Sequence, residues 1–128
     1  LPSNTLSKII QTRDGYIWLA GYNGLVRFDG TYFTTFNKKN TPAFQINSIG
    51  DLYESVDGKL WIGTAGGGLI IHEKDSFRVL QTKTSFNYAV EKIFKDNTNK
   101  LWVGTRSEGV FAFEGGDFRT YNPIEPLS

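Results

Sequence analysis

Three tryptophans, Trp18, Trp61 and Trp102, lie 43 and 41 residues apart, and each stands in the same local sequence. The three surroundings are DGYIWLAGYNGLVRF, DGKLWIGTAGGGLIIH and TNKLWVGTRSEGVFAF. In each, the tryptophan follows a turn and precedes a glycine and an apolar residue by six or seven positions. Self-similarity at a period of about forty residues is the signature of a repeat architecture, in which one copy cannot bury its apolar face alone. The chain is therefore predicted to be three copies of one unit.

Each copy contains four short apolar, β-branched or aromatic runs separated by Gly, Asp and Asn, which predicts four β-strands. In the first copy the predicted strands are Leu6–Gln11, Tyr16–Gly21, Leu25–Phe28 and Phe33–Phe36. No segment keeps an apolar period of 3.6 residues over two turns, so almost no helix is expected. The predicted units are residues 1–40, 41–84 and 85–122, followed by a tail at 123–128.

The second strand of each copy, YIWLA, LWIG or LWVG, is apolar at nearly every position. Such runs are buried on both faces, which a single sheet in water cannot achieve. Stacked four-stranded sheets can, and a unit of about forty residues with a signature tryptophan is typical of a propeller blade. The predicted fold is all-β, a partial β-propeller of three four-stranded antiparallel blades. The three tryptophans are expected to occupy equivalent buried positions.

Composition excludes several classes of protein. The chain has no cysteine, no methionine and a single histidine, so disulfides, His/Cys zinc sites and a Cys-His dyad have no material. Its formal charge of +1 and scattered basic residues argue against nucleic acid as a partner. No apolar run is long enough to span a membrane, so membrane contact is expected only through segments outside this chain. No cofactor is expected. Because residue 1 is leucine, an excised piece of a longer protein is expected.

The motif around the first tryptophan, IWLAGYNGLVRFDG, resembles the two-component regulator propeller repeat, and the other two copies fit the same pattern. Local departures are Asn99, where the other copies have Gly15 and Gly58, and Ile70-Ile71-His72 in the second copy, where the pattern favours a polar residue and an aromatic. The resemblance implies a ligand-sensing segment of a bacterial receptor that binds a small molecule or glycan. It also implies a periplasmic location, as part of an inner-membrane protein, and a histidine kinase, hybrid two-component or diguanylate cyclase output outside this chain.

Strand alternation separates the connections of each blade into two rims. The turn rim carries tight turns such as Asp14-Gly15 and Asp57-Gly58, whose residue types have a structural cause. The variable rim carries the connections that differ between copies, and differing loops on a rigid scaffold are where recognition is expected. Its candidate ligand-binding residues include Tyr22, Asn23, Arg106 and Glu108. The alternative for these residues is an ordinary solvated loop.

Three further candidates share one register, namely Asn4, Asn47 and Tyr88. If the first strand is innermost, as the resemblance implies, they lie at the channel mouth on the variable rim. Asparagine amides donate and accept hydrogen bonds, and an aromatic face stacks on a sugar or an apolar ligand edge. The alternative is that the two asparagines cap backbone groups where a strand begins.

No catalytic or metal-binding residues are predicted. His72 shares its register with Phe28 and Phe113, which indicates a packed position in a strand. The chain is therefore expected not to be an enzyme. A protein-interaction scaffold remains as an alternative function. A propeller lyase is a weaker alternative, because it would need a histidine and an acidic partner in the channel.

Three blades cannot close a ring, since propellers close with four to eight. A homo-oligomer that closes the propeller is therefore expected, because two chains joined head to tail would give six blades. The competing expectation is that the chain is a fragment of a longer propeller, and both hold at once if an excised piece closes by pairing.

Overall fold

The computed structural model describes residues 6–121, and within them the chain forms three four-stranded antiparallel sheets and no helix. In each sheet the strands are neighbours in chain order, which confirms the predicted all-β fold of three four-stranded blades. No helix in this part of the chain could cross a membrane. The strands of blade 1 are β1 (Leu6–Gln11), β2 (Ile17–Gly21), β3 (Gly24–Phe28) and β4 (Phe33–Phe36). Those of blade 2 are β5 (Ile49–Glu54), β6 (Leu60–Thr64), β7 (Leu69–Glu73) and β8 (Ser76–Val79). Those of blade 3 are β9 (Val90–Lys95), β10 (Leu101–Thr105), β11 (Val110–Glu114) and β12 (Asp117–Tyr121).

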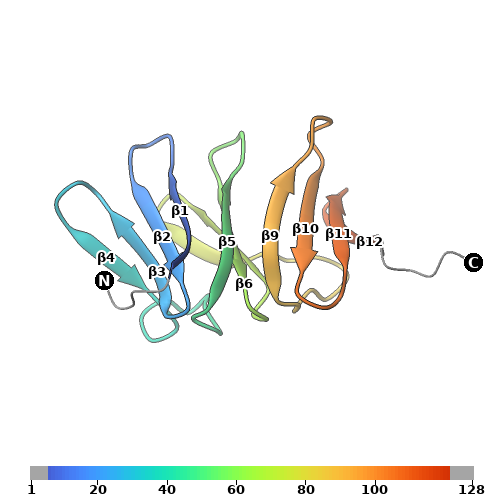
Figure 1. Cartoon of the computed structure of the whole chain (residues 1–128), viewed down its shortest axis with the longest axis horizontal. Coiled ribbons are helices and arrows are strands. Elements are labelled where there is room, and N and C mark those ends of the chain that lie inside the picture. Colours follow the sequence, from blue (N-terminus) through green and yellow to red (C-terminus); the bar gives the residue numbers. More distant parts are fainter. Residues whose placement is uncertain (1–5, 122–128) are drawn as a thin grey trace, which may run out of the picture.

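The three blades stand side by side in chain order (Figure 1). Their first strands meet, because β1 contacts β5 and β5 contacts β9. The fourth strands β4, β8 and β12 are at the opposite edge of each sheet. The first strands are therefore the inner strands of the stack, as the resemblance implies.

Two apolar clusters hold the blades together, one in each seam between neighbouring sheets. In seam 1–2, between blades 1 and 2, the buried residues are Trp18, Ala20, Leu25, Phe44, Ile49, Leu52, Leu60, Ile62 and Ile70. In seam 2–3, between blades 2 and 3, they are Trp61, Leu69, Ile71, Phe86, Val90, Ile93, Leu101, Val103, Phe111 and Phe118. Each second strand contributes to these clusters, which explains why its sequence is apolar without alternation.

The tryptophan of one blade packs on the same register position of the next blade. Trp18 meets His72 with ring centroids 5.0 Å apart, and Trp61 meets Phe113 at 5.4 Å. Trp102 has no such partner, because no blade follows blade 3 within the described residues. It is only half-buried, so the expectation of three equivalent buried tryptophans is wrong for this one.

A buried carboxylate on the inner strand β5 links all three blades. Asp51 accepts a hydrogen bond from the backbone N–H of Ile93 in blade 3 (2.8 Å) and pairs with the ammonium of Lys8 in blade 1 (3.2 Å). Close approach of the inner strands also requires glycine beside it. A Cβ at Gly50 would lie 1.9 Å from the carbonyl oxygen of Val90. The seams are thus closed by specific contacts as well as by apolar packing.

Candidate functional site

In blades 1 and 2, the predicted residues of the variable rim are either exposed or hydrogen-bonded to the backbone of a loop. Tyr22 and Asn23 form the turn between β2 and β3, and both are exposed. Asn47 precedes β5, and its Oδ1 accepts a hydrogen bond from the backbone N–H of Lys38 at 2.8 Å. This amide holds the inter-blade segment in place. Asn4 lies outside the described residues.

The remaining predicted residues lie in or just before blade 3. Tyr88 stacks on Phe111 with centroids 5.2 Å apart, so part of its ring packs on the core. Arg106 pairs through Nε with Oε1 of Glu91 at 3.2 Å, and Glu108 is exposed. Within residues 6–121 no hydrogen bond or ion pair joins two of the predicted site residues. Their role in ligand binding stays a prediction.

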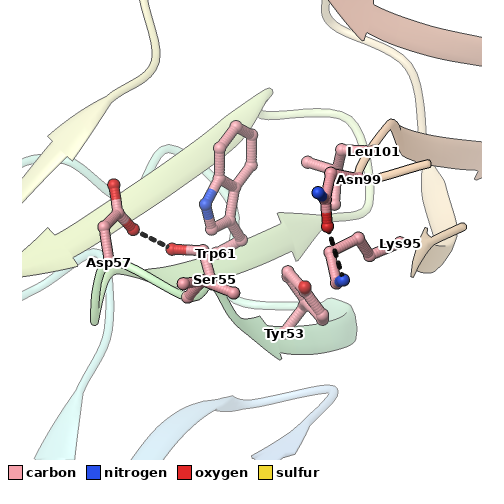
Figure 2. Close-up of a pocket in the computed structure, with 8 residues that line it drawn as sticks. Tyr53, Ser55, Asp57, Trp61, Lys95, Asn99 and Leu101 are labelled. Carbon is pink, nitrogen blue, oxygen red and sulfur yellow. Dashed lines mark hydrogen bonds between the residues drawn. The ribbon is translucent and has the colours of Figure 1, made fainter. Parts of the chain in front are cut away.

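A cavity of about 360 Å³ opens on the turn rim, in seam 2–3 (Figure 2). It lies between the β5–β6 turn and the β9–β10 turn, where the sequence predicts only tight turns. None of the residues predicted for ligand binding lines it. Its lining residues are Tyr53, Ser55, Val56, Asp57, Trp61, Lys95, Asn99 and Leu101.

Charged groups lie at two sides of this cavity. Figure 2 shows Asp57 and Ser55 on one side of Trp61, and Lys95 and Asn99 on the other. The Ser55 hydroxyl donates to the Asp57 carboxylate, and this bond lowers the pKa of Asp57. On the other side, Nζ of Lys95 donates to Oδ1 of Asn99 at 3.0 Å. The cavity therefore has a carboxylate at one end and an ammonium at the other.

A tyrosine and a tryptophan add apolar walls to the cavity. Burial raises the pKa of Tyr53, against the opposing effect of the nearby Arg13. Tyr53 is therefore a neutral phenol at physiological pH. Trp61 is 9% exposed, and its indole Nε1 is buried without a hydrogen-bond partner within the described part of the chain.

The unpartnered indole distinguishes blade 2 from its neighbours. Nε1 of Trp18 donates to the Thr12 hydroxyl at 3.0 Å, and Nε1 of Trp102 donates to the Asp96 carboxylate at 2.8 Å. Ser55 occupies the same register position in blade 2 and, like Thr12, donates to an aspartate two residues further on, but it accepts no hydrogen bond from Nε1 of Trp61. A buried N–H without an acceptor is uncommon and requires an explanation.

The same place in seam 1–2 is bridged by an arginine. Arg13 donates to the backbone carbonyls of Ser55 and Val56 and pairs with Glu54, at 3.6 Å between Nε and Oε2. In seam 2–3 the register equivalent of Arg13 is Val56, and that of Glu54 is Lys95. A short side chain and a reversed charge thus leave open in seam 2–3 what is filled in seam 1–2. Comparison of the repeats at these two positions is the sequence signal that could have indicated the cavity.

His72 has the surroundings of a packed side chain. Its ring lies 5.0 Å from that of Trp18 and 4.5 Å from that of Phe77, between centroids. Burial, helped by the charge of Arg27, lowers its pKa and favours the neutral imidazole. Across residues 6–121 no group of three His, Cys, Asp or Glu could hold a metal ion.

A family model described as "Two component regulator propeller" matches residues 43–66, which run from the segment before β5 to just past β6. Among curated proteins, no sequence matches the chain.

Three solved structures from B. thetaiotaomicron share the fold. One is the extracellular domain of BT3049, described as a hybrid two-component system, with a TM-score of 0.73, 28% identity and coverage of 93% of this chain. Two structures of the extracellular domain of BT4673, described once as a one-component and once as a hybrid two-component system, have TM-scores of 0.76 and 0.74 at 20% and 19% identity. They cover 92% and 91% of this chain.

This chain spans only 17%, 17% and 16% of those three chains. The match at residues 43–66 and the shared fold confirm the resemblance that the tryptophan motifs indicate. The chain is a three-blade β-propeller segment whose residues 43–66 match the two-component regulator propeller model, and it is similar to the extracellular domain of a hybrid two-component system.

Proposed function

We propose that this chain is a ligand-sensing segment of a bacterial signal-transduction receptor. It lies outside the cytoplasm, in the extracytoplasmic part of an inner-membrane protein, and binds a small molecule without transforming it. The signal passes to a kinase or cyclase domain outside this chain. The similarity to the extracellular domain of a hybrid two-component system, at 28% identity over 93% of this chain, supports this proposal.

The cavity in seam 2–3 is the observation that carries ligand binding. It combines apolar walls with a few polar groups, which is the usual composition of a small-molecule site. Its lining comes from two blades, Tyr53 and Trp61 from blade 2 and Lys95 and Leu101 from blade 3. A ligand held there contacts both blades, so binding favours one relative position of the two sheets. Such a change is what a receptor can pass on.

The experiment is a screen of the 128-residue chain against a library of glycans and small metabolites. Binding is followed by thermal shift and by tryptophan fluorescence, because Trp61 lines the cavity. The proposal expects saturable binding by some members of the library and no turnover of those that bind.

A matched control variant comes from the chain itself. Val56→Arg combined with Lys95→Glu rebuilds in seam 2–3 the arginine and glutamate of seam 1–2. This double variant is expected to keep the fold and to lose binding. Substitution of Tyr22 and Arg106 by alanine tests the variable rim in the same way. Loss of binding there, with binding retained in the double variant, would move the site to the variable rim.

We also propose that separate chains pair head to tail. On the end face of blade 1, Leu6 and Ile9 are 43% and 59% exposed, whereas their register equivalents Ile49 and Leu52 are 1% and 2% exposed. Trp102, on the other end face, lacks the contact that the other two tryptophans make. End faces of a repeat stack that expose apolar side chains favour association.

A pair joined by these faces would place Trp102 of one chain on blade 1 of its partner. Light scattering tests the pairing. Two chains per particle would support it, and a stable species at the mass of one 14.4 kDa chain would contradict it. In a longer protein, further blades would cover the same faces.

A further inference from the structure

We infer that the cavity in seam 2–3 selects a small carboxylate with a flat apolar body, whose carboxylate is held by Lys95. This inference rests on the proposed ligand-sensing function and names the ligand class for the same cavity. It follows from the charge at one end of the cavity, from the walls, and from the comparison of the two seams.

The first step concerns the charge of Lys95. Its ammonium has three N–H donors, and the hydrogen bond to Oδ1 of Asn99 at 3.0 Å occupies one of them. Within residues 6–121 no carboxylate lies within 4.0 Å of this ammonium, although seven other cation–carboxylate pairs occur there. Two donors of a held ammonium are thus available to an anion.

The second step concerns the carboxylate on the other side of the cavity. Asp57 accepts from the Ser55 hydroxyl and lies 3.4 Å from the ammonium of Lys59, measured between Oδ2 and Nζ. Its charge is therefore already compensated by a neighbour outside the cavity lining. The charge that remains uncompensated at the cavity is positive.

The third step concerns the walls. Tyr53, Trp61 and Leu101 present apolar surface, and Val56 stands where an arginine closes the other seam. A volume of about 360 Å³ between aromatic walls suits a planar body with few rotatable bonds.

The N–H of Trp61 is a further polar group at this cavity that a ligand could satisfy. It lacks an acceptor, and Trp61 is nine-tenths buried in the cavity lining. In Figure 2 its nitrogen is on the Ser55 and Asp57 side, away from Lys95. A ligand with a hydroxyl or carbonyl oxygen opposite its carboxylate could accept this hydrogen bond after a shift of the Ser55 side chain. This predicts that 4-hydroxyphenylacetate binds better than phenylacetate.

The test measures dissociation constants of the 128-residue chain for phenylacetate, 4-hydroxyphenylacetate and the neutral isostere phenylacetamide. Charge-assisted hydrogen bonds are about twice as strong as neutral ones, so the carboxylates are expected to bind about tenfold more tightly than the amide. Lys95→Met, which keeps an unbranched side chain one atom shorter and removes the charge, is expected to abolish this preference. The matched control is Lys92→Met, an exposed lysine of the same strand, which is expected to keep it.

The outcomes separate this inference from the proposed function. Equal binding of carboxylate and amide, or a carboxylate preference that survives Lys95→Met, would overturn the ligand class. A screen whose hits are all neutral or cationic would also overturn the ligand class, but it would leave the ligand-sensing proposal standing. The absence of any hit in the full library, these three probes included, would overturn the ligand-sensing proposal as well.

Discussion

Asp51→Ala is expected to lower the free energy of unfolding by about 3 kcal/mol, because it leaves buried backbone donors without an acceptor. The Asp51 side chain is 2% exposed. Its Oδ2 accepts from the N–H of Ile93 at 2.8 Å, and its Oδ1 accepts from the N–H of Leu52 at 2.9 Å. The same carboxylate pairs with Lys8 at 3.2 Å.

The magnitude follows from these three contacts. Each buried N–H that loses its partner costs about 1–3 kcal/mol, and two lose theirs. The hydrogen bond to Leu52 joins adjacent residues, so its loss is expected to cost about 1 kcal/mol, the lower end of this range. Lys8 is 37% exposed and regains water when the carboxylate is removed, so the lost ion pair adds little. The expected total is therefore about 3 kcal/mol.

Guanidinium denaturation followed by tryptophan fluorescence measures this loss. The control is Glu91→Ala, which removes a carboxylate from an ion pair with Arg106 whose side chains are 49% and 64% exposed. Exposed pairs contribute about 0–1 kcal/mol, so the control is expected to change little. A loss below about 1 kcal/mol for Asp51→Ala, or one equal to that of the control, would refute the role of this carboxylate in joining the blades.

Three further predictions follow from the seams. Trp61→Ala is expected to cost about 3–5 kcal/mol in free energy of unfolding and Trp102→Ala clearly less, because only the first is packed between two blades; a cost below about 1 kcal/mol for Trp61→Ala would mean that the blade register is wrong. In the monomeric chain Gly63→Ala is expected to cost about 1–3 kcal/mol, since its Cβ would lie 2.4 Å from a side-chain carbon of blade 3. Gly104→Ala, in the same register with its nearest contact at 3.8 Å, is expected to be close to neutral, and equal effects in denaturation curves would contradict this. The pKa of His72 is lowered in the folded chain, so below about pH 6.5 the unfolded chain binds a proton that the folded chain does not. The free energy of unfolding therefore falls as the pH drops through that range. His72→Phe should remove this part of the decline between pH 7.5 and 5.5, and an unchanged decline would contradict the assignment.

Most of the fold could be predicted from the repeats. Turn residues separate the apolar runs so regularly that the predicted first and fourth strands of blade 1 match β1 and β4 in their bounds. Differences are small, since β2 begins at Ile17 instead of Tyr16 and β3 at Gly24 instead of Leu25. Local sequence is sufficient here because each blade is built from contacts between neighbouring strands.

The burial of Trp102 could not be predicted in the same way. Its local sequence follows the same pattern as those of Trp18 and Trp61, but the burial of this tryptophan depends on the following blade. Sequence equivalence therefore predicts the strand position, and the place in the stack determines the exposed fraction. The same reason leaves Leu6 and Ile9 exposed although their equivalents are buried.

The candidate site was missed for a different reason. The Gly, Asp and Asn residues of the turn rim are explained by the tight turns that they form. The difference between Arg13 in blade 1 and Val56 in blade 2 therefore does not indicate a binding site by itself. Whether a seam is open or closed depends on two side chains from different blades, Val56 with Lys95 in one seam and Arg13 with Glu54 in the other. Comparison of the repeats shows that both positions vary, but the structure is needed to show that the two side chains meet across a seam.

Fluorine NMR of the chain labelled with 5-fluorotryptophan tests the central claim, ligand binding in seam 2–3, most directly. The chain has three tryptophans, so three resonances are expected, and single Trp→Phe variants assign them. Titration with 4-hydroxyphenylacetate, or with the tightest binder of the screen, is predicted to shift the Trp61 resonance saturably and to leave that of Trp18 unchanged, because Arg13 bridges the corresponding place in seam 1–2. Saturable binding that leaves the Trp61 resonance unmoved, or that shifts the Trp18 resonance by as much, would contradict the account.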